Sequence, residues 1–144
     1  MDHEIRKLTI DDYDEIIRVW SFSGLPFKPK GRDSRDMMEK EIANPNCAFF
    51  GMFGGAKMVG VVIANFDGRR GWINRLALDP DYRGKGHARQ LIGRAEEFLY
   101  EVGAVVICAL IEDINYPSIA CFQAAGYTCE PIIKYFTKRP SPDA

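Results

Sequence analysis

Strand-like and helical patterns alternate along the first third of the chain. Polar and apolar residues alternate over 4–10, which predicts a first strand. Apolar side chains then recur at helical spacing over 13–20, after the capping sequence Thr9-Ile10-Asp11-Asp12. A loop rich in glycine and proline over 22–33 separates this helix from a shorter, polar helix over 34–42. This part of the chain therefore predicts one strand followed by two covering helices.

Three further strands are predicted in the middle of the chain. Apolar, strand-like runs cover 47–53, 58–66 and 72–78. The turns between them are the short, glycine-containing segments 54–57 and 67–71. Connections this short join antiparallel neighbours, so the three strands should form an antiparallel meander.

The second half predicts two helices and up to three strands. Seven apolar positions form a helical stripe over 84–102, and Gly103 stands where a glycine would end the helix. A continuous apolar run over 104–111 is typical of a strand covered on both faces. A shorter helix over 116–125 precedes one or two final strands over 127–137. The whole order predicts an α/β fold, with a mixed, mostly antiparallel twisted sheet and helices on both faces.

Composition fits one ordinary globular domain. The 144 residues are 47% hydrophobic and 27% charged, and we expect a single domain over 1–138 with a frayed tail over 139–144. Nineteen basic against twenty acidic residues give a net charge of −1, without the global positive field that nucleic acid would require. No apolar run approaches the ~20 residues of a membrane span, and no secretory signal opens the chain. We therefore expect a cytoplasmic protein with neither a membrane nor a nucleic-acid partner.

The cysteines add one constraint on redox state and metal binding. Their spacings of 61, 13 and 8 residues contain no C-x-x-C pair, and the chain has only two histidines, so no metal site is expected. Reduced thiols buried as small hydrophobes are the favoured reading, while disulfides and a Cys/His nucleophile pair stay open as alternatives. The four residues are Cys47, Cys108, Cys121 and Cys129.

The most informative segment is Arg83-Gly84-Lys85-Gly86-His87-Ala88, between a predicted strand and the longest helix. Backbone N–H groups at a helix start have no intrahelical partner, and the helix dipole is positive there. Glycines let that backbone approach a ligand, and Arg89 and Arg94 add charge in a stretch without acids. The pattern predicts a phosphate-binding loop, with a merely solvated helix start as the alternative. Neither G-x-x-x-x-G-K-[ST] nor G-x-G-x-x-G is present.

The same segment resembles a known family. Residues 83–88 fit [Q/R]-x-x-G-x-[G/A], the pyrophosphate signature of the GNAT superfamily of acetyl-coenzyme A-dependent N-acetyltransferases. The preceding run 76–80, Leu-Ala-Leu-Asp-Pro, is similar to that family too. So is the later segment with Asn115, Ala120, Phe122 and Gly126-Tyr127. The resemblance extends in strand order over nearly the whole chain.

The resemblance implies a fold in which strands 72–78 and 104–111 splay apart and leave backbone groups free to hold the pantetheine arm. Asn115 would contact the pantetheine side, although it could equally be a simple helix cap. Phe122 would pack near the thioester. The implied cofactor-binding residues are Leu76, Ala77, Leu78, Arg83, Gly84, Lys85, Gly86, His87, Ala88, Asn115 and Phe122.

The implied reaction moves the acetyl group of acetyl-coenzyme A to a primary amine by direct attack in a ternary complex. A lysine-like amine costs roughly 4–5 kcal/mol to deprotonate at pH 7, which calls for a general base. Glu112 is the first candidate and Asp113 the second, with an exposed strand-end charge as the alternative reading of Glu112. The backbone amide of Leu76 would polarise the thioester carbonyl.

One position departs from the family pattern. Many relatives carry a tyrosine where this chain has Phe122, and a phenyl ring cannot protonate the leaving thiolate. Tyr116 could substitute, but helical spacing puts it on a different face; water is the other donor. The departure keeps two alternatives open: a non-catalytic coenzyme A-binding or regulatory module, and an acyltransferase that prefers a longer acyl group.

The acceptor is the least constrained part of the prediction. Phe27 in the variable loop and the outward side chains Trp72 and Asn74 are the expected acceptor-binding residues, while Trp20 completes a helix stripe and reads as core. The acceptor is a small-molecule or peptide amine, and the chain is expected to act as a monomer or homodimer.

Overall fold

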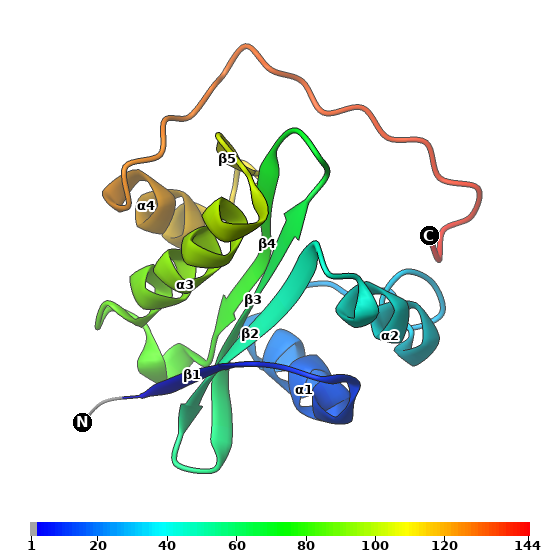
Figure 1. Ribbon diagram of the computed structural model, residues 1–144, viewed down its shortest axis with the longest axis vertical. Helices are drawn as coiled ribbons and strands as arrows, with labels where there is room; N and C mark the ends of the chain where they lie inside the picture. The colour runs from blue at the N-terminus through cyan, green and yellow to red at the C-terminus, as the bar shows by residue number, and fades with distance from the viewer. Residues whose placement is uncertain (1–2) are drawn as a thin grey trace.

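The computed structural model describes residues 3–144, and its centre is one five-stranded sheet (Figure 1). The strands lie side by side in chain order, and the first four are antiparallel, while β5 runs parallel to β4. They are β1 (Glu4–Lys7), β2 (Cys47–Gly54), β3 (Lys57–Phe66), β4 (Gly71–Leu78) and β5 (Ile107–Ala109). The predicted mixed, mostly antiparallel sheet is confirmed.

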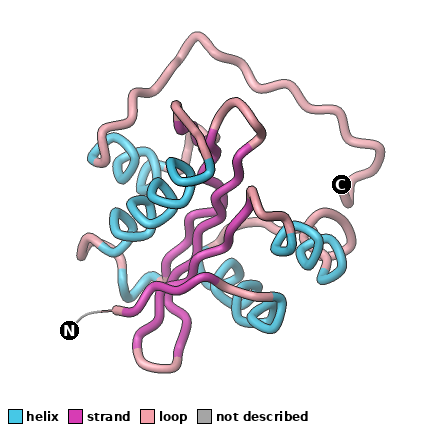
Figure 2. Tube along the Cα trace, viewed as in Figure 1, coloured by secondary structure: helices cyan, strands magenta, loops and turns pink. Residues whose placement is uncertain are grey.

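Helices cover both faces of this sheet, as the sequence predicts. Figure 2 shows α1 and α2 on one side of the strands and α3 and α4 on the other. The helices are α1 (Tyr13–Ser23), α2 (Arg35–Ala43), α3 (His87–Val102) and α4 (Tyr116–Ala124), with 3-10 turns at η1 (Ile10–Asp12) and η2 (Pro80–Tyr82).

Two hydrophobic clusters fill the two sides of the sheet. Neighbouring residues of a strand point to opposite faces, so Phe49 packs in the cluster of α1 and Phe50 in that of α3. Trp20 is fully buried in the α1 cluster, which confirms that it belongs to the core. On the other side, the apolar stripe of α3 buries Leu91 and Leu99.

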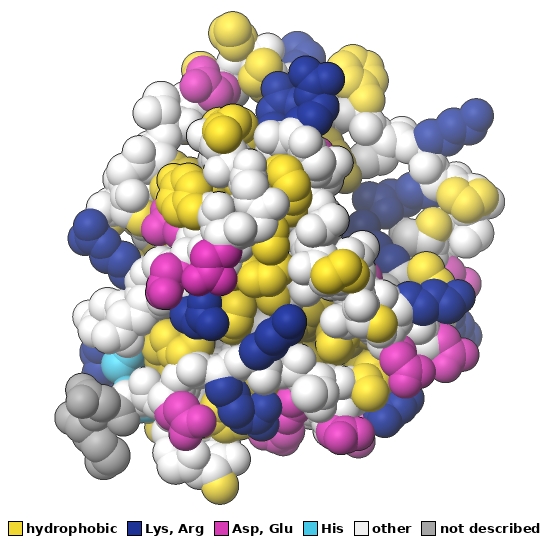
Figure 3. Space-filling model, in the orientation of Figure 1, with side chains coloured by type: hydrophobic (Ala, Val, Ile, Leu, Met, Phe, Trp, Pro, Cys, Tyr) yellow, Lys and Arg dark blue, Asp and Glu magenta, His cyan; other side chains and the backbone are white. Residues whose placement is uncertain are grey.

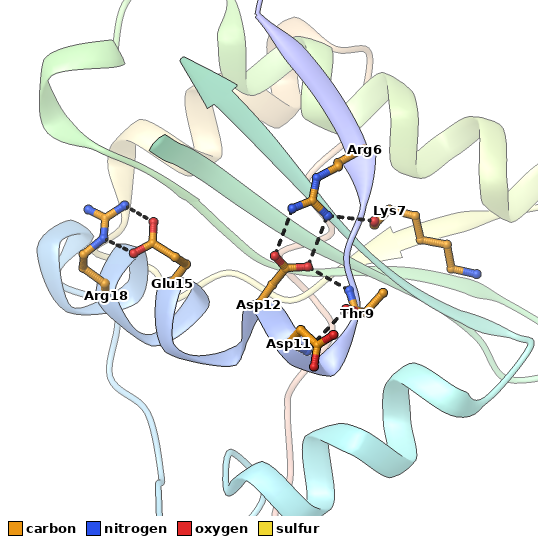
Figure 4. Close-up of polar contacts among 7 residues, drawn as sticks. All are labelled: Arg6, Lys7, Thr9, Asp11, Asp12, Glu15 and Arg18. Atoms are coloured by element: carbon orange, nitrogen blue, oxygen red, sulfur yellow. Dashed lines mark hydrogen bonds and ion pairs between the residues drawn. The ribbon is translucent and has the colours of Figure 1, made fainter. Parts of the chain in front are cut away.

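The connection from β1 to α1 is held by the polar contacts in Figure 4. The N–H of Thr9 donates to an Asp12 carboxylate oxygen at 2.9 Å, and the N–H of Asp11 donates to Thr9 Oγ1 at 3.3 Å. Asp12 also pairs with Arg6 at 2.9 Å, and Glu15 pairs with Arg18 at 2.8 Å. The predicted capping sequence is therefore present, but it caps the 3-10 turn η1 that leads into α1, and within the described chain α1 itself has no side-chain cap.

The predicted strands over 127–137 are wrong. Residues 128–144 form turns and coil, and Figure 1 shows this segment leaving α4 and crossing above the sheet toward α2. Its apolar side chains are exposed, with Phe136 at 88%. Near its end, Lys28 Nζ donates to the carbonyl of Pro142 at 2.9 Å. Strand-forming residues make a strand only when another strand pairs with them, and here none does within the described chain.

The strand predicted over 104–111 is shorter and less covered than expected. Only Ile107–Ala109 pair with β4, and Val105 and Leu110 are exposed at 87% and 53%. β5 is the last strand of the sheet, and none of its three residues is fully buried, so coverage on both faces is not achieved. The apolar run indicates a strand correctly but overestimates its length and burial.

Candidate functional site

The sheet opens between β4 and β5. β5 pairs with β4 only over Gly71–Ile73, so the second half of β4 has no neighbour on that side in the described chain. The N–H of Asp79 donates to Val59 in β3 at 2.8 Å. Because backbone groups alternate along a regular stretch of strand, those of Leu78 point the other way, toward the opening. The result is an unpaired strand edge beside a gap in the sheet.

Two cavities of about 390 and 480 Å³ meet at this edge and form one cleft. We call the smaller one the Glu112 half and the larger one the Gly86 half, after a residue lining each. Five residues line both halves, which is why the two count as one cleft: Ser23, Leu25, Leu76, Asn115 and Ser118. They belong to the end of α1 and the loop after it, to β4, and to the start of α4.

The Gly86 half ends at the start of α3. Gly84 and Gly86 have φ angles of 77° and 84°, in the left-handed region that favours glycine. A Cβ on either glycine would meet no atom within 4 Å, so the backbone there faces open space. No side chain caps the helix, which leaves its first N–H groups free to bind an anion. Arg89 lines the same half and adds a positive charge.

Most of the predicted cofactor residues meet in the cleft. Those lining the Gly86 half are Leu76, Ala77, Leu78, Arg83, Gly84, Gly86, Ala88 and Asn115, and Phe122 lines the Glu112 half. Lys85 and His87 line neither. The His87 ring turns toward β1 and lies 4.4 Å from the His3 ring, centroid to centroid.

Two polar residues of the cleft are held by the main chain. Arg83 Nη2 donates to the carbonyls of Ser23 at 3.3 Å and Leu78 at 3.4 Å, and so links α1 to the free edge of β4. Asn115 Oδ1 accepts the N–H of Ser118 at 3.4 Å, so Asn115 caps α4 and lines the cleft at once. The two readings of Asn115 are therefore compatible.

The Glu112 half contains one carboxylate and no tyrosine. Glu112 lines it, whereas Asp113 lines neither half. Phe122 is only 4% exposed and packs edge-on against Tyr127, with ring centroids 5.0 Å apart. Tyr116 is 71% exposed and so lies on a different face of α4, as its spacing predicts. The Tyr127 hydroxyl donates to Glu96 at 2.7 Å, and burial raises its pKa.

The three predicted acceptor residues lie outside the cleft lining. Phe27 packs against the α1 cluster, Trp72 Nε1 donates to Asp67 at 3.0 Å, and Asn74 pairs with Ile63 of β3. The lining instead includes Arg75, which sits one residue beyond Asn74.

Arg75 and Arg32 are the charged lining residues that the sequence does not single out. Alternation along 72–78 offers no signal for Arg75, because β4 has an irregular register at this point. Arg32 belongs to the loop after α1. The sequence predicts this loop over 22–33 as a whole and does not single out Arg32 within it. A helix that stops at Ser23 brings that loop against the cleft.

Cysteines and other possible ligands add no further site. All four cysteines are free; Cys47 is buried, and burial raises the pKa of its thiol to about 12. Cys129 is exposed, so the expectation of four buried thiols is wrong. Over the described residues 3–144, no cluster of three or more His, Cys, Asp or Glu could hold a metal ion. No helix in that range is long and apolar enough to cross a membrane.

The sequence model of the acetyltransferase (GNAT) family matches residues 10–127. The chain belongs to the GNAT acetyltransferase family. An acetyltransferase of Sodalis glossinidius is 29% identical to this GNAT protein over 136 residues, covering 94% of each chain. An acetyltransferase of Yersinia pestis is 30% identical over 130 residues, covering 90% of this chain and 91% of the relative.

Solved structures share the GNAT fold. The PaiA N-acetyltransferase of Thermoplasma acidophilum, in complex with coenzyme A, superposes with a TM-score of 0.77 at 22% identity, covering 90% of this chain and 92% of that one. The aminoglycoside acetyltransferase AAC(6')-Iy, in complex with a coenzyme A–acetylneamine bisubstrate analogue, gives 0.80 at 17% identity, covering 96% and 99%. At these identities the likeness extends to the fold alone.

Proposed function

We propose that this acetyltransferase moves the acetyl group of acetyl-coenzyme A to a primary amine by direct attack in a ternary complex. The observation that carries the proposal is the continuity of the cleft, in which the unpaired edge of β4 leads to the open start of α3. An unpaired strand edge binds amides and an open helix start binds phosphate. One cleft therefore offers partners for both the pantetheine arm and the pyrophosphate of coenzyme A.

The chain's own groups fit that co-substrate along the Gly86 half. The backbone groups of Leu76 and Leu78 would pair with the pantetheine amides, and Asn115 would contact the same arm. The backbone of residues 84–88 would hold the pyrophosphate, with the open space at both glycines leaving room for it. Arg83 and Arg89 line the same half and add positive charge to it. Lys85 and His87 would contribute through backbone N–H groups, since their side chains line neither half.

The reaction would take place where the halves meet. Acetyl-coenzyme A supplies a thioester carbonyl carbon for the amine to attack, forming a C–N bond and breaking the C–S bond. The Leu76 N–H would donate to the carbonyl oxygen, and Glu112 would accept the proton that the amine loses. Phe122 would pack at this junction without supplying a proton. A thiol with a pKa near 8.5 costs only about 2 kcal/mol to release ionised at pH 7, so the thiolate can leave and take its proton from water.

Two alternatives have specific support. Phe122 in place of a tyrosine is the observation behind a non-catalytic coenzyme A-binding module, and the open Glu112 half leaves room for an acyl group longer than acetyl. Both alternatives differ from acetyl transfer in what happens in the Glu112 half, while the Gly86 half would still bind coenzyme A. Activity and binding must therefore be measured separately.

The test is release of free thiol from acetyl-coenzyme A with pooled primary amines and short peptides as acceptors. We expect turnover that falls at least tenfold in Glu112→Gln, with Asp113→Asn as the matched control that keeps wild-type turnover. Propionyl- and succinyl-coenzyme A run in parallel identify a longer acyl preference. Coenzyme A binding without thiol release from any acyl donor would establish the non-catalytic alternative. If coenzyme A leaves the melting temperature unchanged, the proposal fails at its first step.

A further inference from the structure

Arg75 has an unusual backbone conformation. Its φ angle is 57°, and within residues 3–144 every other residue with φ in the left-handed region is a glycine. β3–β4 pairing runs from Val61↔Ala77 to Ile63↔Asn74, so Arg75 and Leu76 share one opposite position. This is a β-bulge, and a residue other than glycine is strained at such a φ. Strained side chains of this kind concentrate at binding sites, which makes the surroundings of Arg75 informative.

The guanidinium of Arg75 is incompletely paired. It stacks on Trp20, 4.1 Å from the ring centroid, and its side chain is only 17% exposed. The Asp33 carboxylate lies 3.6 Å from Nη2, too far for a hydrogen bond, and that same oxygen accepts the N–H of Lys28 at 2.7 Å. Within the described chain, neither Nε nor Nη2 of Arg75 donates to a partner. Burial lowers the pKa of Arg75, because a buried cation has lost its hydration.

The same side chain lines the Glu112 half of the cleft, where the lining carries three charged residues. Two are guanidinium groups, Arg75 and Arg32, and the third is the carboxylate of Glu112. Among the side chains that line this half, positive charge therefore exceeds negative charge, while Asp33, 3.6 Å from Arg75 and outside the lining, offsets part of the Arg75 charge. An acceptor that is only an amine would add a further cation beside two arginines, whereas a carboxylate on the acceptor would balance them.

We infer that the acceptor carries a carboxylate as well as its amine, and that Arg75 and Arg32 bind this carboxylate while the amine lies toward Glu112. The inference rests on the proposed function, since it names the class of acceptor for the same cleft. The acceptor class is that of amino acids, in which the two groups sit on one small molecule. A guanidinium held flat against an indole keeps its charge in a fixed place beside the cleft, where it attracts a carboxylate.

The experiment compares two acceptor pools that differ only in the carboxylate. One contains the twenty free amino acids and the other the twenty matching amino acid amides. We expect the wild-type protein to favour the free acids by about tenfold or more in kcat/KM, mostly through KM. Arg75→Met keeps an apolar chain over Trp20 but removes the charge, and it should bring the ratio of acids to amides close to one. Arg32→Met, at an exposed loop position, should lower the ratio without a folding defect.

Arg35→Met is the matched control. Arg35 also lies over an aromatic ring, 5.7 Å from the centroid of Tyr13, but lines neither half of the cleft. This variant should keep the wild-type ratio, and a ratio that falls in Arg35→Met as much as in Arg75→Met would overturn the inference. Equal turnover of acids and amides by the wild-type protein would overturn it too, while leaving the proposed acetyl transfer intact.

A binding measurement covers the case in which no acceptor is turned over, which would count against the proposed function. The probes are pooled N-acetyl amino acids and pooled N-acetyl amino acid amides, titrated calorimetrically in the presence of coenzyme A. Binding of the acids at least tenfold tighter, lost in Arg75→Met, would support the carboxylate site even without catalysis. Equal affinity for both pools would refute it.

Discussion

Gly86 is the residue on which the proposed phosphate site depends most directly. Gly86→Glu would place a bulky negative side chain in the open space at the start of α3, where an anion is expected to bind. We expect coenzyme A affinity to fall by at least tenfold, measured by isothermal titration calorimetry. Gly68→Glu is the matched control, because Gly68 also has a positive φ, of 93°, and open space around it, but it lies in the β3–β4 turn. Equal losses in the two variants would point to backbone strain and contradict the phosphate site.

Cys47 makes stability depend on pH in the alkaline range. Its pKa is raised by burial to about 12 in the folded protein, against an ordinary value of 9.0. Below pH 9 the thiol is protonated in both states and has no effect; above it, only the unfolded chain ionises, so stability falls as pH rises. Between pH 8 and pH 10 this loss should be about 1 kcal/mol.

Urea unfolding of the wild-type protein and Cys47→Ala at both pH values isolates this effect. Cys47→Ala is less stable than the wild-type protein at pH 8, because a small cavity replaces the thiol. The difference in free energy of unfolding should be smaller at pH 10, because only the wild-type protein loses stability through this thiol. A constant difference would mean that the Cys47 thiol ionises in the folded state as readily as in the unfolded one.

At the scale of elements, the packing of α3 on the sheet requires Gly60. A Cβ there would lie 2.7 Å from Leu78 Cδ2 and 2.9 Å from Leu91 Cδ1. Gly60→Ala should therefore destabilise the protein by about 1–3 kcal/mol. In a Leu91→Ala background the clash with Leu91 is gone. The double variant should therefore lose less free energy of unfolding than Gly60→Ala and Leu91→Ala lose in sum.

Gly93→Ala serves as the control for this cycle. Gly93 lies in α3, where an added Cβ would meet no atom within 4 Å. An alanine in a helix interior is better than glycine by roughly 0.5–1 kcal/mol, so this variant should be stabilised. Strict additivity of Gly60→Ala and Leu91→Ala in denaturant unfolding would show that α3 is not packed against this glycine.

Elements with a local cause are predictable from the sequence. The helical stripe over 84–102 and the apolar run over 58–66 depend on neighbours along the chain, and both elements are present. Residues 127–137 are different, because side chains such as Ile132 and Phe136 suit a strand, but pairing with a distant edge decides whether one forms. Strand pairing depends on residues far away in the sequence, so the sequence of the segment itself does not show whether it will pair.

The cleft divides in the same way. Its glycine-rich side is predictable because Gly84 and Gly86 are residues that allow a positive φ and a close approach of the backbone to a ligand. Its acceptor side is not, because Arg75 enters the lining through a bulge that contains no glycine, and regular alternation selects Asn74 in its place. Leu76 and Asn115, which the sequence does single out, line both halves of the cleft.

At the scale of the whole molecule, the exposed C-terminal segment should be the first part that proteases reach. Figure 3 shows charged and hydrophobic side chains interspersed over one face of the protein, without a single dominating charge patch. Lys134 and Lys138 are exposed in a segment with no strand pairing, so limited trypsin digestion should cut there first. Mass spectrometry should find a persistent fragment ending at Lys134 or Lys138. A first cut elsewhere, with these sites resistant, would indicate that the segment is paired in solution.

The short pairing of β5 sets a limit on how rigid the cleft can be. Three residue pairs join β5 to the sheet, whereas β3 pairs with a neighbour on each side along most of its length. Local opening should therefore begin at β5, and its amide hydrogens should exchange with solvent faster than those of β3. A ligand that spans the gap would oppose this opening, so coenzyme A should slow exchange at residues 107–109. Coenzyme A would thus take the place of the pairing that β4 and β5 lack. The tighter it binds, the more it would raise the free energy of unfolding of the protein.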